Sequence, residues 1–164
     1  MGVEKTKKIL FCIGTVVLFI GVVAFFWPRS LADMNHQPKS VRIEIIESDA
    51  LHSRMTIEIP AESPELDEIM DLLDQYSYHY SLRTIPSLLD NGPSLEGNQA
   101  GFWLNIYLYS EPNYMGACFS IISGGTKEII WGDAIWRIGY WGNGKNIEMM
   151  NAFYNLVASY KEES

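Results

Sequence analysis

An unbroken apolar run near the N-terminus is the first pattern in the chain. Ile9–Trp27 holds 19 residues without a charged side chain. A helix needs about 20 such residues to cross a hydrocarbon core of about 30 Å. Lys5, Lys7 and Lys8 precede the run. The positive-inside rule therefore predicts a transmembrane anchor over 9–27, with residues 1–8 in the cytoplasm and the rest of the chain extracytoplasmic.

A cleaved secretory peptide is the alternative for this segment. Ser30 and Ala32 place small residues where a signal peptidase reads them, just beyond Pro28. The apolar region of a signal peptide is usually only about 7–15 residues long, which favours a retained anchor. Both interpretations export the remaining chain. In the second, the same domain is secreted after cleavage near Ala32.

A change of pattern marks the start of a folded domain. Residues 28–40 have no hydrophobic periodicity and are interpreted as a stalk, so we expect an extracytoplasmic domain over 41–164. Apolar and polar positions alternate in Val41–Ile45 and again in Met55–Ile59. This pattern, on both sides of a polar connection, predicts two half-buried strands that form a hairpin.

Helical periodicity follows in two segments. Ser63-Pro64-Glu65 is a typical helix start, with a hydroxyl for the free amides and proline at the first helical position. Apolar residues at helical spacing then form one stripe. A second helix is expected from Asn146 to the C-terminal region. The apolar stripes are Leu66, Ile69, Met70, Leu72, Leu73 and Tyr76, and Ile147, Met150, Phe153, Tyr154, Val157 and Tyr160.

Five short runs rich in β-branched and aromatic residues lie between the two helices and predict strands. Turn residues with short connections separate most of them, which favours antiparallel neighbours. The expected order is ββαβββββα, an α+β fold with one antiparallel sheet packed against two helices. The expected strands are Tyr78 to Ile85, Gly101 to Tyr109, Tyr114 to Ile122, Lys127 to Trp131 and Ile135 to Trp141.

Charge and cysteine content narrow the function. The whole chain has a net charge of −8, and residues 33–164 alone carry −11. Nucleic acid is therefore excluded as a partner, because backbone binding requires a patch of Lys and Arg. Beyond the N-terminal run Cys118 is the one cysteine, so the domain folds without an internal disulfide.

Motifs for catalysis are missing from the sequence. It contains no Gly-x-Ser-x-Gly, His-Glu-x-x-His, Cys-x-x-Cys or Walker loop, and we expect neither a cofactor nor a metal. A small extracytoplasmic hydrolase is the alternative, with Cys118 as nucleophile and His52 or His79 as base, or with a pair of carboxylates brought together by the fold. Cys118 stands in an apolar strand, where a small buried residue is the commoner role. An enzyme is therefore the less favoured alternative.

One strand carries an aromatic pattern that points to binding. Phe102, Leu104, Ile106 and Leu108 form its apolar side, so the rings at alternate positions leave the core. His79 and Arg83 occupy alternate positions of the preceding strand and are expected at the edge of this surface. Rings beside polar groups suit an envelope protein or a glycan. The candidate binding residues are Trp103, Tyr107, Tyr109, Arg83 and His79.

The layout as a whole resembles uncharacterised small single-span exported proteins of Gram-positive bacteria. The resemblance is one of architecture, and its most suggestive segments are Leu66–Tyr80 (LDEIMDLLDQYSYHY) and Trp136–Tyr140 followed by the closing helix. It implies an extracytoplasmic module of the cell envelope with no catalytic residue to carry over. We therefore expect a membrane-tethered binding module, whose ligand and oligomeric state the sequence does not identify.

Overall fold

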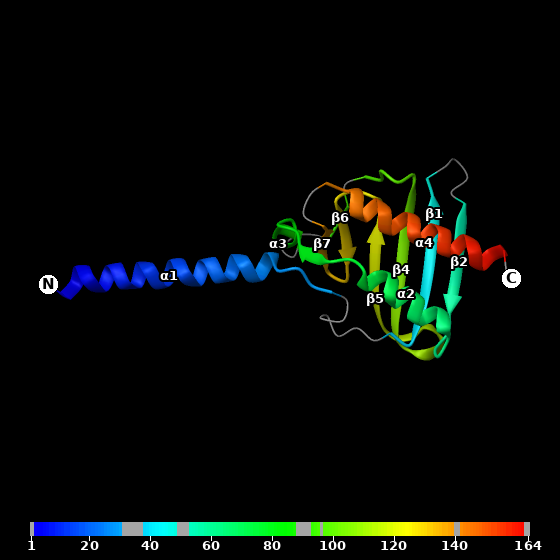
Figure 1. Cartoon of the computed structure of the whole chain (residues 1–164), viewed down its shortest axis with the longest axis horizontal. Helices are drawn as coiled ribbons and strands as arrows, with labels where there is room; N and C mark the ends of the chain where they lie inside the picture. The colour runs from blue at the N-terminus through cyan, green and yellow to red at the C-terminus, as the bar shows by residue number, and fades with distance from the viewer. Residues whose placement is uncertain are drawn as a thin grey trace.

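A long N-terminal helix and an α+β domain make up the computed structural model (Figure 1). The structure describes residues 2–30, 38–48, 53–87, 93–95, 97–139 and 142–162. Helix α1 (Gly2–Phe26) is apolar, exposed along its length, and long enough to cross a membrane. The domain lies beyond its C-terminal end (Figure 1).

Seven strands form one antiparallel sheet in the order β2-β1-β4-β5-β6-β7-β3. The α+β class expected from the sequence is thus confirmed. The strands are β1 (Ser40–Glu47), β2 (Arg54–Ile59), β3 (Tyr78–Tyr80), β4 (Phe102–Glu111), β5 (Met115–Ser123), β6 (Glu128–Trp131) and β7 (Ala134–Ile138). The remaining elements are α2 (Pro64–Asp74), α3 (Thr84–Ser87), the 3₁₀ turn η2 (Pro112–Tyr114) and α4 (Gly144–Glu162).

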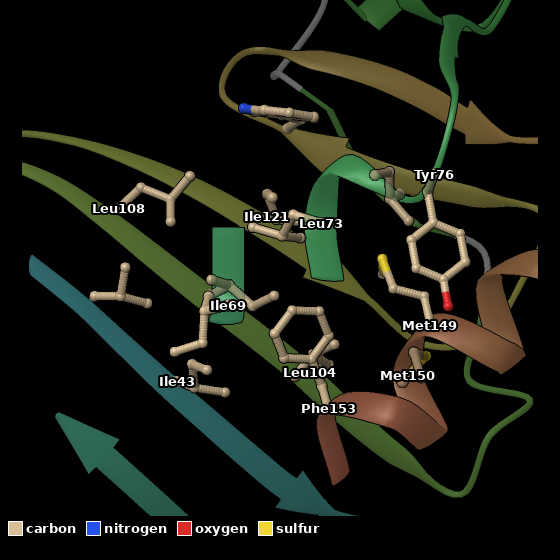
Figure 2. Packing of buried hydrophobic residues seen from close by; sticks show 14 of the residues in the cluster. Ile43, Ile69, Leu73, Tyr76, Leu104, Leu108, Ile121, Met149, Met150 and Phe153 are labelled. Atoms are coloured by element: carbon tan, nitrogen blue, oxygen red, sulfur yellow. The ribbon is translucent and has the colours of Figure 1, made fainter. Parts of the chain in front are cut away.

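Helices α2 and α4 both contribute side chains to the hydrophobic core. Ile69 and Leu73 of α2 and Phe153 of α4 are completely buried, and they meet Leu104 and Ile43 from the sheet (Figure 2). The two helices lie on the same side of the sheet (Figure 1). Within the described part of the chain, no long helix covers the opposite face of the sheet.

A buried amide joins α4 to the sheet. The side chain of Asn146 donates a hydrogen bond to the Thr126 carbonyl at 2.6 Å. Its oxygen accepts one from the Ser123 hydroxyl at 2.8 Å. Asn146 and Ser123 are fully buried, so each satisfies a polar group that would otherwise be costly to bury. The sequence places the start of α4 at Asn146, whereas the helix begins two residues earlier.

The strand expected over Tyr78 to Ile85 is wrong beyond Tyr80. The Ser81 amide and the Thr84 hydroxyl both donate to the carbonyl of Ile135, at 2.9 Å and 2.5 Å. The Thr84 hydroxyl also accepts from the Ile135 amide at 3.1 Å. The Thr84 hydroxyl thus bonds the carbonyl and the amide of Ile135, which the backbone of a longer β3 would otherwise bond. The chain turns here, and α3 follows.

Candidate recognition surface

The two faces of β4 differ in burial. Exposure alternates along the strand, with Phe102, Leu104, Ile106 and Leu108 buried and the residues between them partly exposed. Successive side chains of a strand point to opposite faces, so Trp103, Tyr107 and Tyr109 lie on the face away from α2 and α4. None of these three rings is fully buried.

The strand register shows which side chains share that face. In one row across the sheet, Arg42 of β1 stands between Glu58 of β2 and Tyr107 of β4. In the next row, Tyr109 stands beside Cys118 of β5. Neighbouring strands lie about 4.8 Å apart, so residues in one row are within side-chain reach of each other.

Arg42 is the central cation of this surface. Its guanidinium lies 5.3 Å from the ring centre of Tyr114 and 6.0 Å from that of Tyr109. The same group forms an ion pair with Glu58 at 2.6 Å. The rings of Tyr109 and Tyr114 meet edge to face, 5.8 Å apart. We call Arg42 together with the rings of Trp103, Tyr107, Tyr109 and Tyr114 the aromatic face.

Tyr114 is held in an unusual backbone conformation. Its φ is +61°, in the left-handed region that costs an ordinary residue about 1–2 kcal/mol. The register slips between Tyr109 and Glu111, and η2 follows this irregularity. The Ser40 hydroxyl steadies the bend, because it donates to the Glu111 carbonyl at 2.9 Å and accepts from the Tyr114 amide at 3.2 Å. The bend carries the Tyr114 ring to Arg42.

Trp103 occupies the other end of the aromatic face, beside a glycine. A Cβ on Gly124 would stand 2.8 Å from the Trp103 ring and 2.9 Å from the Gly97 carbonyl oxygen. Real Cβ contacts are not that short, so the backbone at Gly124 approaches the ring as only glycine allows. The Trp103 ring is therefore fixed by close packing on the end of β5.

Electrostatics on this part of the sheet are balanced. Arg42 pairs with Glu58, and Arg54 pairs with Glu44 at 2.5 Å. Burial first, and then the negative charge of Glu44, raise the pKa of Tyr107, which stays a neutral hydroxyl. Although the domain is strongly acidic, this surface offers paired charges, neutral hydroxyls and rings.

His79 and Arg83 lie elsewhere. His79 is on β3 at the far edge of the sheet, and β5, β6 and β7 separate β3 from β4. Four strand spacings place it at least about 19 Å from the aromatic rings of β4. Arg83 forms an ion pair with the buried carboxylate of Glu128 at 2.6 Å, and the Ser81 hydroxyl donates to the same carboxylate at 2.5 Å. The structure therefore does not bring these two residues to Trp103, Tyr107 and Tyr109.

The residues of the alternative catalytic set are also apart. Cys118 lies on β5 and His79 on β3, three strand spacings and so at least about 14 Å apart, while His52 is outside the described residues. Cys118 is exposed, whereas its apolar strand predicted a small buried residue. Partial desolvation still raises the pKa of its thiol, which opposes the thiolate that a nucleophile needs. In the described part of the chain, no three His, Cys, Asp or Glu residues are grouped to hold a metal.

Sequence reasoning missed Arg42 and Tyr114. Arg42 reaches the rings only because β1 pairs with both β2 and β4, and Tyr114 only because of the bend after β4. A Pro-Asn-Tyr segment after a strand was the available signal for that bend. No family model, curated protein or solved structure matches this chain.

Proposed function

We propose that this protein is a membrane-tethered binding module on the extracytoplasmic side of the cell membrane, and that its aromatic face binds a neighbouring envelope protein. The observation that carries the proposal is the aromatic face itself. Four rings and one arginine gather on the side of the sheet opposite the packed helices. Tyr, Trp and Arg dominate the binding energy of protein interfaces.

Retention of the N-terminal helix is supported by its contacts with the domain. Arg29 and Tyr78 exchange two backbone hydrogen bonds, at 2.7 and 2.8 Å. The ring of Phe25 stacks on that of Tyr80 at 5.4 Å. Cleavage near Ala32 would remove both contacts and leave the edge of β3 open, which favours an anchor over a secretory peptide.

A protein partner fits this surface better than a glycan. Two ion pairs spread over the strands β2, β1 and β4 offer charges of both signs to a partner, as protein interfaces do. A glycan would use the same rings through stacking on sugar faces. The two ligands are distinguished by the experiment that follows.

Site-specific photocrosslinking in the membranes of the producing cell tests the binding proposal. A photoreactive phenylalanine replaces Tyr109 in the aromatic face, and a matched variant carries it at Asp71, an exposed position of α2 on the helix side. We expect one discrete, protease-sensitive adduct from position 109 and none from position 71. An adduct from both positions, or from neither, contradicts the proposal. A protease-resistant, glycosidase-sensitive adduct points to a glycan instead.

Membrane extraction tests the anchor. We expect the full-length protein to stay in the membrane after a carbonate wash. In intact cells from which the cell wall has been removed, we expect external protease to digest the domain. A soluble form that begins near Asp33 would contradict anchoring while leaving export intact. Protection of the domain from external protease would contradict the proposed orientation.

A further inference from the structure

The junction between α1 and the sheet is short. Helix α1 ends at Phe26, and Arg29 is already paired with Tyr78 of the edge strand β3. Three residues span at most about 11 Å, even when fully extended. The headgroup layer on each side of a bilayer is about 5–8 Å thick. If α1 crosses a membrane, this edge of the sheet must lie at the membrane surface.

Stacked rings hold the same junction together. The ring of Tyr80 stacks on Phe25 of α1, at 5.4 Å, and on Trp136 of β7, at 4.0 Å, with an interplanar angle of 28° in each pair. The Arg29 guanidinium is 5.0 Å from the ring centre of Tyr80. Aromatic residues with a cation beside them are typical of the membrane–water interface. The contacts fix the orientation of the domain on the helix.

Large apolar side chains are exposed at this end of the domain. Leu82 is 63% exposed, Ile85 53% and Phe119 39%. Ile85 and Phe119 line a mainly apolar groove of about 410 Å³ together with Phe25 of the membrane helix. The groove is thus continuous with the apolar surface of α1. Exposed apolar patches of this kind mark sites that contact a membrane, a ligand or another protein.

Charge on this surface differs from that of the whole domain. Residues 33–164 carry −11, which repels anionic headgroups. Asp133 is the one charged residue among those that line the groove, and Arg29 lies close by against Tyr80 and Trp136. The surface next to α1 is therefore close to neutral, where the rest of the domain is acidic.

We infer that the end of the domain around α3 rests on the lipid bilayer, with the side chains of Leu82, Ile85 and Phe119 in the headgroup region. The inference builds on the membrane anchoring proposed above. Such docking would fix the orientation of the sheet relative to the membrane. The sheet stands with β3 at the membrane and β2 at the far edge, so the aromatic face on β1 and β4 is presented to the side, above the lipid surface.

Fluorescence quenching in lipid nanodiscs tests the inference with the full-length protein. The probe is the fluorophore NBD on single cysteines, and the quencher is phosphatidylcholine with a doxyl group at acyl carbon 5. Cys118→Ser leaves the native Cys12 in α1 as the label site. Ile85→Cys and Thr56→Cys are made in a chain that also carries Cys12→Ser and Cys118→Ser. Thr56 is exposed on β2, the opposite edge of the sheet.

We expect quenching at position 85 to be at least threefold stronger than at position 56, and strong quenching at Cys12. Strong quenching at Cys12 with equally weak quenching at 85 and 56 overturns bilayer docking while keeping the anchor. Equal and strong quenching at 85 and 56 overturns the upright orientation. Absence of quenching at Cys12 overturns both the anchor and the docking.

Discussion

The two faces of the central sheet are made by alternate residues of the same strands, yet they differ in burial and in the polarity of their side chains. Leu104 and Ile106 of β4 are completely buried under the helices. Tyr107, which follows Ile106 in the same strand, is only partly buried and stands beside Arg42. The buried face supplies stability through packing, which leaves the aromatic face available for contact with a partner.

The largest effect is expected from a cavity beneath the helices. Leu73→Ala removes a completely buried side chain of α2 and should cost about 2–5 kcal/mol of unfolding free energy. Tyr109→Ala, on the aromatic face, should cost less than about 1 kcal/mol, the usual range for a cross-strand pair. Urea unfolding of the full chain in micelles, followed by near-UV circular dichroism, measures both. Equal losses would remove the distinction between the faces.

A smaller loss is expected where Trp103 meets the sheet end. Gly124→Ala places a methyl group 2.8 Å from the Trp103 ring, and such overpacking costs about 1–3 kcal/mol. Gly144→Ala is the matched control, because nothing lies within 4 Å of its added Cβ at the start of α4. The control should be neutral or slightly stabilising. If both variants unfold alike, Trp103 is not fixed as described.

Two variants of Tyr114 distinguish an effect on stability from an effect on binding. Tyr114→Gly relieves the left-handed backbone while removing the ring, whereas Tyr114→Ala removes the ring and keeps the strain. The glycine variant should therefore be more stable than the alanine variant by about 1–2 kcal/mol. Both should give a weaker crosslink from position 109. If the crosslink were weakened only in the less stable alanine variant, the loss would come from stability, and the Tyr114 ring would make no contact with the partner.

The smallest effect concerns His79, at the edge that carries α3. Burial and the charge of Arg137 lower the pKa of His79 from its ordinary 6.5. The unfolded chain then binds the proton more tightly, so stability is unaffected above pH 6.5 and falls as the pH drops below it. His79→Gln should flatten this part of the stability curve. An identical pH dependence in the two proteins would show that His79 does not contribute.

Local patterns in the sequence were sufficient to predict most of the strands and the two long helices of the domain. Alternation predicted the two faces of β4 and the hairpin of β1 and β2, because a strand with one buried side must follow a period of two. The proline at the start of α2 and its apolar stripe likewise predicted a helix there. These features depend on residues that are close together in the chain, so they can be predicted from a single sequence.

Long-range pairing was beyond the same reasoning. Edge strand β3 pairs with β7, more than 50 residues later, so His79 is far from the rings it was expected to join. Nothing local marks that choice. The turn after Tyr80 depends on Thr84 meeting Ile135 and on Ser81 and Arg83 meeting Glu128. Arg42 joins the aromatic face only after β1 has taken its place between β2 and β4.

Hydroxyl-radical footprinting shows whether the aromatic face contacts a partner in the membrane. Oxidation of Trp103, Tyr107 and Tyr109 is compared between purified protein in micelles and native membranes. Tyr160, a half-buried tyrosine of α4, is the matched control on the helix side. We expect oxidation of the three rings in micelles, protection in native membranes, and no change at Tyr160. Equal oxidation of these rings in both preparations would contradict the proposed contact.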